Sequence, residues 1–153
     1  MTNIAIFVSG QGSNCENIIK HFSISKDIKI SLVLSNRADA YALVRAKKYN
    51  VPTEVVSKEE FKNENTLMAI MKKYEIDFIV LAGFLLMVPD FLINGYQHKI
   101  INIHPALLPK YGGKGMYGQH VHEAVLAQKD TEHGITIHFV NEKYDEGAPI
   151  FQA

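Results

Sequence analysis

The sequence has a single cysteine, Cys15, among its 153 residues. One cysteine cannot form a disulfide framework within a chain, so we expect the reducing environment of the cytoplasm. Charge of one sign is not in excess either, since 16 basic residues balance 16 acidic residues. This balance argues against broad electrostatic binding to nucleic acid or to an anionic membrane, although it leaves room for one small anion site.

Long hydrophobic runs are also lacking. No apolar run approaches the roughly 20 residues that span a bilayer. The N-terminal residues show a strand pattern rather than the charged segment and apolar block of a signal peptide, so we expect no such peptide. The chain is therefore expected to have neither membrane nor nucleic acid as a partner, while its oligomeric state stays open.

The remaining composition is that of an ordinary globular protein, with 47% apolar and 21% charged residues. A chain of this length suits a single domain, and it buries about 68–70% of its unfolded surface without needing disulfides or a structural metal. We therefore expect residues 1–153 to form one domain.

Short apolar runs alternate with helical patterns along the first two thirds of the chain. The runs are typical of strands buried on both faces of a parallel sheet, and they occupy Asn3–Ser9, Ile30–Ser35, Thr53–Val56, Asp77–Ala82 and Lys99–Ile103. Apolar stripes at helical spacing lie between them, within Cys15–Phe22, Ala40–Lys47 and Leu67–Tyr74. This alternation predicts an α/β domain with a doubly wound, mostly parallel sheet and helices on both faces.

The last third follows a different pattern. Pro105–Gly118 is rich in glycine and proline and predicts a long ordered loop. A helix is expected around His120–Gln128, an alternating strand at Gly134–Val140 and the start of another strand at Ile150–Gln152.

The first candidate site is the glycine-rich turn Ser9–Asn14, between the first strand and the first helix. Its two glycines allow a tight turn and a close approach of a ligand, and Ser13 with Glu16 predicts a capping box. Free amides and the positive end of the helix dipole favour a phosphate here. A plain strand-to-helix turn with a good cap explains the same residues equally well. Cys15 occupies the last glycine position of the dinucleotide motif, which argues against NAD or FAD.

The second candidate site is Asn102-Ile103-His104-Pro105, at the carboxyl end of a predicted strand. Ligands of open α/β sheets bind at such ends. Alternation puts Asn102 and His104 on the same side of the strand, where an amide donor and an imidazole can stabilise an oxyanion and move a proton. The alternative is a core histidine bonded to backbone; the strand end and the paired asparagine favour function.

Asp145 belongs to a third, weaker candidate, the acidic turn Asp145-Glu146-Gly147. A carboxylate beside His104 would favour the imidazolium form, but a solvated turn explains the motif better unless the two lie close together. The histidines His120, His122, His133 and His138 lack the spacing of a zinc site, so we expect no metal. His138 points either into the site or into a polar core.

These motifs, taken together and in this order, resemble the phosphoribosylglycinamide formyltransferases, folate-dependent enzymes of purine synthesis. The resemblance rests on the segments Ser9–Asn14, Leu81–Phe84, Ile101–Tyr111, His133–Val140 and Tyr144–Gly147, and it spans nearly the whole chain. It implies the formyltransferase fold and two small-molecule partners, glycinamide ribonucleotide and the co-substrate 10-formyltetrahydrofolate. No metal is implied.

The resemblance also implies roles for individual residues. The catalytic residues it implies are Asn102, His104 and Asp145. The residues it implies for the ribonucleotide phosphate are Gly12, Ser13 and Asn14. The residues it implies for the folate are Leu85, Leu86, Met87, Val88, Asn102, Asn141, Glu142, Lys143, Tyr144 and Asp145.

The sequence departs from the family pattern in three ways. The loop Gly112–Gly118 is longer than in shorter relatives, and its role stays open. Many relatives carry an arginine at the position of Leu86, so we expect backbone and apolar contacts to the folate there. The family normally continues past Ala153, so we expect this chain to lack a C-terminal strand and helix. Two alternatives stay open: a nucleotide-binding fragment with impaired catalysis, and another folate formyltransferase or formyltetrahydrofolate hydrolase with the same catalytic trio.

Overall fold

The computed structural model describes residues 1–104, 136–140 and 149–152, and its framework is one seven-stranded sheet. The strands follow the order β3-β2-β1-β4-β5-β6-β7 across the sheet. The bounds are β1 Thr2–Val8, β2 Ile28–Ser35, β3 Thr53–Val55, β4 Phe78–Leu81, β5 Ile100–His104, β6 Thr136–Phe139 and β7 Pro149–Gln152. The first five strands are parallel, whereas β6 runs antiparallel to β5 and β7 antiparallel to β6. The expectation of a mostly parallel sheet is confirmed.

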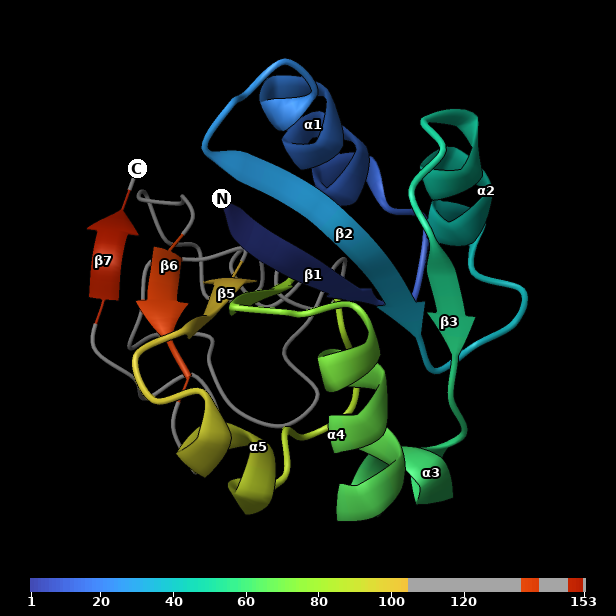
Figure 1. Ribbon diagram of the computed structural model, residues 1–153, viewed down its shortest axis with the longest axis vertical. Coiled ribbons are helices and arrows are strands. Elements are labelled where there is room, and N and C mark those ends of the chain that lie inside the picture. The colour runs from blue at the N-terminus through green and yellow to red at the C-terminus, as the bar shows by residue number, and fades with distance from the viewer. Residues whose placement is uncertain (105–135, 141–148, 153) are drawn as a thin grey trace, which may run out of the picture.

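Helices cover both faces of this sheet (Figure 1). Helices α1 and α2 lie on one face, and α3, α4 and α5 lie on the other. Their bounds are α1 Ser13–Phe22, α2 Tyr41–Lys48, α3 Lys58–Lys62, α4 Glu64–Lys73 and α5 Asp90–Gly95. The predicted helix around His120–Gln128 lies outside the described residues.

The alternation of β1 side chains explains this two-sided architecture. Ile4, Ile6 and Val8 pack into the core beneath α1 and α2. Ala5 and Phe7 face the opposite way and pack into the core beneath the other three helices. Because successive strand residues point to opposite faces, an apolar run such as this one requires cover on both sides. The continuous apolar pattern of β1 therefore dictates the doubly wound fold.

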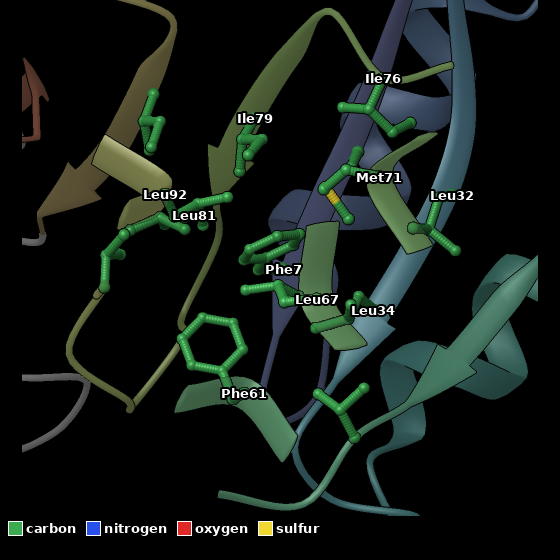
Figure 2. Packing of buried hydrophobic residues seen from close by; sticks show 14 of the residues in the cluster. Phe7, Leu32, Leu34, Phe61, Leu67, Met71, Ile76, Ile79, Leu81 and Leu92 are labelled. Carbon is green, nitrogen blue, oxygen red and sulfur yellow. The ribbon is translucent and has the colours of Figure 1, made fainter. Parts of the chain in front are cut away.

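The larger of these cores contains two buried phenylalanines, Phe7 and Phe61 (Figure 2), and Phe84 packs against it. The Phe7 and Phe61 rings pack edge to face with centroids 5.8 Å apart, and Phe84 lies 5.0 Å from Phe61. Phe61 belongs to α3, a helix of five residues that Ser57 and Glu60 hold in a complete capping box. Helices α3 and α5 were not expected from the sequence, because one or two turns are too short to show a helical period.

The apolar stripe expected on α2 was only partly right. Its buried residues are Ala42, Leu43 and Ala46, whereas Val44 is 47% exposed. Two of these three buried residues are alanines, and their small side chains let α2 approach the sheet and the glycine-rich turn closely. Ala42 thereby comes within hydrogen-bond distance of Gly10 in the glycine-rich turn.

The strand order fixes where a ligand can bind. The chain moves from β1 to β2 and β3 on one side, and then crosses to β4 and β5 on the other. The strand order therefore reverses between β1 and β4, and ligands of such sheets bind at the carboxyl ends beside this reversal. The glycine-rich turn follows β1, and the Leu85–Val88 segment follows β4. Asn102 lies on the next strand, β5, paired with Leu81 of β4.

Candidate functional site

The glycine-rich turn takes a different form from the one the sequence predicts. Gly12 is the N-cap of α1, with a left-handed φ of 78°, and no side chain caps the helix. Ser13 is already the first helical residue, so its predicted capping role is wrong. Glu16 donates its backbone N–H to the Gly12 carbonyl at 2.9 Å, and its carboxylate binds Arg45 instead of closing a capping box. Only glycine adopts the conformation of residue 12 at little cost, and that conformation displaces the cap by one residue.

Helix α2 holds this turn in place. The Ala42 amide donates to the Gly10 carbonyl at 3.1 Å. A Cβ at position 12 would lie 2.4 Å from the Cβ of Ala42 and 2.6 Å from its Cα. The turn therefore needs glycine for two reasons, the backbone angle and the space. Ser13 and Asn14, the other residues expected at the phosphate, are both exposed to solvent.

A buried hydroxyl joins this turn to the segment after β4. Ser9 is 3% exposed, and its Oγ donates to Oδ1 of Asn36 at 2.6 Å. The same Oγ accepts the Leu85 amide at 3.0 Å, and the Ser9 amide donates to the Gly83 carbonyl at 3.2 Å. Two segments for which the family resemblance implies different substrates are thus hydrogen-bonded to each other. The roles of Ser9 and Asn36 were missed, because a serine at a strand end gives no sign of its partners.

The segment Leu85–Val88 alternates between solvent and core. Leu85 is 40% exposed and Met87 is 51% exposed, whereas Val88 is buried. Leu86, for which we expected apolar contacts to the folate, packs against the larger core. The segment therefore presents two apolar side chains and its backbone at the carboxyl end of the sheet.

Asn102 lies opposite His138 in the antiparallel pairing of β5 with β6. Its Nδ2 is 3.2 Å from Nε2 of His138, and Nδ1 of His138 is 3.0 Å from the Phe139 carbonyl oxygen. A carbonyl can only accept, so Nδ1 carries the proton. In the neutral ring Nε2 then accepts from the Asn102 amide. His138, which is 2% exposed, thus orients the carboxamide of Asn102.

The other expected catalytic residues are described only in part. The backbone of His104 belongs to β5 and pairs with Thr136 of β6, but its side chain lies outside the described part. Asp145 and the expected folate residues Asn141, Glu142, Lys143 and Tyr144 also lie outside it. The structure therefore brings together the turn, the Leu85–Val88 segment and Asn102 at one edge of the sheet.

Cys15 is enclosed beside the glycine-rich turn and is no nucleophile. Its side chain is fully buried, and this burial, followed by the charge of Glu16, raises the pKa of the thiol to about 12. The thiol stays protonated at neutral pH, and thiols react as thiolates. We expect iodoacetamide at pH 8 to label Cys15 far more slowly in the folded protein than in urea. Labelling of the folded protein at the rate of a free thiol would contradict this burial.

Within residues 1–104, 136–140 and 149–152, no helix is long and apolar enough to cross a membrane. Within the same ranges, no three histidine, cysteine, aspartate or glutamate side chains gather closely enough to hold a metal ion.

Known proteins resemble this chain along its whole length. The formyl transferase family model matches residues 2–153. The phosphoribosylglycinamide formyltransferase of Haemophilus influenzae is 41% identical, over 100% of this chain and 72% of its own length. The chloroplastic enzyme of the same name from Arabidopsis thaliana is 39% identical, over 98% of this chain and 53% of its own length.

A solved structure agrees with this similarity. The crystal structure of phosphoribosylglycinamide formyltransferase from Anaplasma phagocytophilum superimposes with a TM-score of 0.88 at 34% identity, over 99% of this chain and 70% of that one. The fold and the sequence similarity therefore point to the same family. This chain belongs to the formyl transferase family and has its α/β fold.

Proposed function

We propose that this chain transfers the formyl group of 10-formyltetrahydrofolate to the amine of glycinamide ribonucleotide, a step of purine synthesis and one-carbon metabolism. Its relatives carry the name of this activity. The observation that supports the chemistry most directly is the Asn102 carboxamide, a hydrogen-bond donor oriented by His138. It lies on β5, next to the strand that borders the reversal of strand order, where this fold class binds ligands.

The two substrates would meet at this edge of the sheet. We assign the ribonucleotide phosphate to Gly12, Ser13 and Asn14, because a helix N-terminus presents amides and a positive dipole end to an anion. We assign the folate to Leu85–Val88 and Asn141–Asp145. In the first of these segments the exposed Leu85 and Met87 supply apolar surface for a flat ring system.

The reaction we propose is an acyl transfer through a tetrahedral oxyanion. The glycinamide nitrogen attacks the formyl carbon, and the former carbonyl oxygen gains the negative charge. Asn102 and protonated His104 donate hydrogen bonds to that oxygen, while Asp145 favours the protonated imidazole. The attacking nitrogen loses its proton through water to Asp145. The bond to the folate nitrogen then breaks, and His104 or a nearby water protonates the leaving group.

A formyl-transfer assay tests this function. The protein is incubated with glycinamide ribonucleotide and 10-formyltetrahydrofolate carrying an isotopically labelled formyl group. We expect the label to appear in formylglycinamide ribonucleotide, detected by mass spectrometry, only when both substrates and the protein are present.

Two other outcomes would contradict the proposal. Label released as formate, whether or not the ribonucleotide is added, would indicate a hydrolase. Binding of the ribonucleotide by calorimetric titration, with no label transferred, would indicate a nucleotide-binding fragment.

We also propose the cytoplasm as the site of action and small molecules as the partners. The single cysteine supports the first assignment, because it cannot form a disulfide framework within the chain. The balanced charge supports the second, because a net charge of zero gives no general attraction to anionic polymers.

A further inference from the structure

In the backbone of the glycine-rich turn, three consecutive carbonyl oxygens each accept a hydrogen bond. Gly10 accepts from the Ala42 amide at 3.1 Å, and Gly12 accepts from the Glu16 amide at 2.9 Å. Between them, the carbonyl of Gln11 accepts from Nε of Arg45 at 2.7 Å. Two of these bonds join backbone atoms. The bond to Gln11 alone depends on a side chain.

The direction of these carbonyls sets the direction of the amides. In a trans peptide the C=O and the following N–H point to opposite sides. Because the three carbonyls face α2 and the first turn of α1, the amides of Gln11, Gly12 and Ser13 face away from them. Within the described part of the chain, none of these amides donates to a backbone carbonyl. They are the donors that a phosphate at this turn would use.

Arg45 is held firmly enough to act on this turn. Its Nη1 binds the Glu16 carboxylate at 3.2 Å, and its guanidinium lies 4.9 Å from the centroid of the Tyr41 ring. Its side chain is 24% exposed and that of Glu16 is 16% exposed. A planar guanidinium can serve two acceptors and stack on a ring at the same time, which a lysine ammonium cannot do.

Glu16 gives Arg45 a second role. The Glu16 carboxylate lies in the first turn of α1, beside the turn that is to receive an anion. An uncompensated negative charge there would repel a phosphate. Arg45 and, at 3.5 Å, Lys20 both neutralise it.

We propose that Arg45 is a positioning residue for the ribonucleotide phosphate. It holds the Gln11 carbonyl so that the amides of the turn face the phosphate, and it neutralises Glu16 without touching the ligand. This proposal rests on the assignment of the phosphate to Gly12, Ser13 and Asn14. It adds a residue to which neither the sequence motifs nor the family resemblance gave a role.

Steady-state kinetics on Arg45→Ala tests the proposal. We expect the KM for glycinamide ribonucleotide to rise by about 10-fold or more, while the KM for 10-formyltetrahydrofolate and kcat change by less than about 2-fold. Inhibition by inorganic phosphate, measured against the ribonucleotide, should weaken in parallel. Arg45→Lys keeps the charge but cannot bind the Gln11 carbonyl and the Glu16 carboxylate with one planar group, so it should give an intermediate KM. It serves as the test variant if the alanine protein does not fold.

Arg37→Ala is the matched control. Arg37 precedes α2 and forms an exposed ion pair with Asp39. Its loss is expected to leave both KM values unchanged. Equal rises of both KM values in the Arg45 variants would show a general structural role and overturn the proposal.

The Gly12→Ala variant distinguishes the role of Arg45 from the assignment of the phosphate to this turn. If Gly12→Ala raises the ribonucleotide KM and the Arg45 variants do not, the role of Arg45 is wrong and the phosphate site stands. If neither the Gly12 variant nor the Arg45 variants change that KM, the phosphate does not bind at this turn and both assignments fail.

Discussion

Alanine at Asn102 or at His104 is expected to lower kcat for formyl transfer by about 10²–10³-fold, the usual cost of losing a preorganised oxyanion donor. The loss should fall on kcat rather than on KM, because the charge that these groups stabilise exists only in the transition state. The measurement is the steady-state rate with both substrates saturating, together with a thermal melt to establish that the variant is folded.

Asn3→Ala is a matched control for the asparagine. Asn3 lies at the opposite end of the sheet, as the second residue of β1, and its Nδ2 donates to the Glu75 carbonyl at 3.1 Å. Its loss can lower the melting temperature but should leave kcat unchanged. A fall in kcat of equal size for Asn3→Ala would mean that the Asn102 effect reports folding and not chemistry.

Gly12→Ala is expected to raise the KM for glycinamide ribonucleotide by about 10-fold or more. The new Cβ would lie 2.4 Å from the Ala42 Cβ, and the residue would keep a φ of 78°. A left-handed conformation costs a non-glycine residue about 1–2 kcal/mol, and the clash adds to it. Since backbone atoms of α2 are in the way, the turn itself must move and carry its amides away from the phosphate.

Gly10→Ala provides the comparison for this prediction. A Cβ at position 10 meets nothing within 4 Å, and that glycine has no left-handed φ. The alanine should therefore change the ribonucleotide KM much less at position 10 than at position 12. Similar KM values for the two variants would show that the geometry of residue 12 does not control binding at this turn.

The fold was largely predictable because its main signals are local. The apolar runs of β1, β2 and β4 are nearly continuous, and this pattern required helices on both faces. The boundaries of β3 and β5 matched to within one residue of the predicted runs. Helix α3 was missed because its five residues are too few to show a helical period, although Ser57 and Glu60 have the spacing of a capping box.

The site was less predictable because its geometry depends on pairing and on backbone angles. The contact between Asn102 and His138 follows from the register of β5 with β6, which no spacing in the sequence shows. The capping error at Ser13 has a similar origin, since the motif fits two caps and only the left-handed φ of Gly12 distinguishes them. Arg45 resembles any basic residue near the end of a helix until its contact with Gln11 is seen.

We propose that formyl transfer occurs at the carboxyl end of β5. Its most direct test is the single-turnover rate of a folded His104→Ala variant, measured with saturating 10-formyltetrahydrofolate and glycinamide ribonucleotide. We expect a rate at least about 10²-fold below that of the unmodified protein, with an unchanged thermal transition. A folded variant that transfers the formyl group at a near-normal rate would show that His104 does not take part in the chemistry.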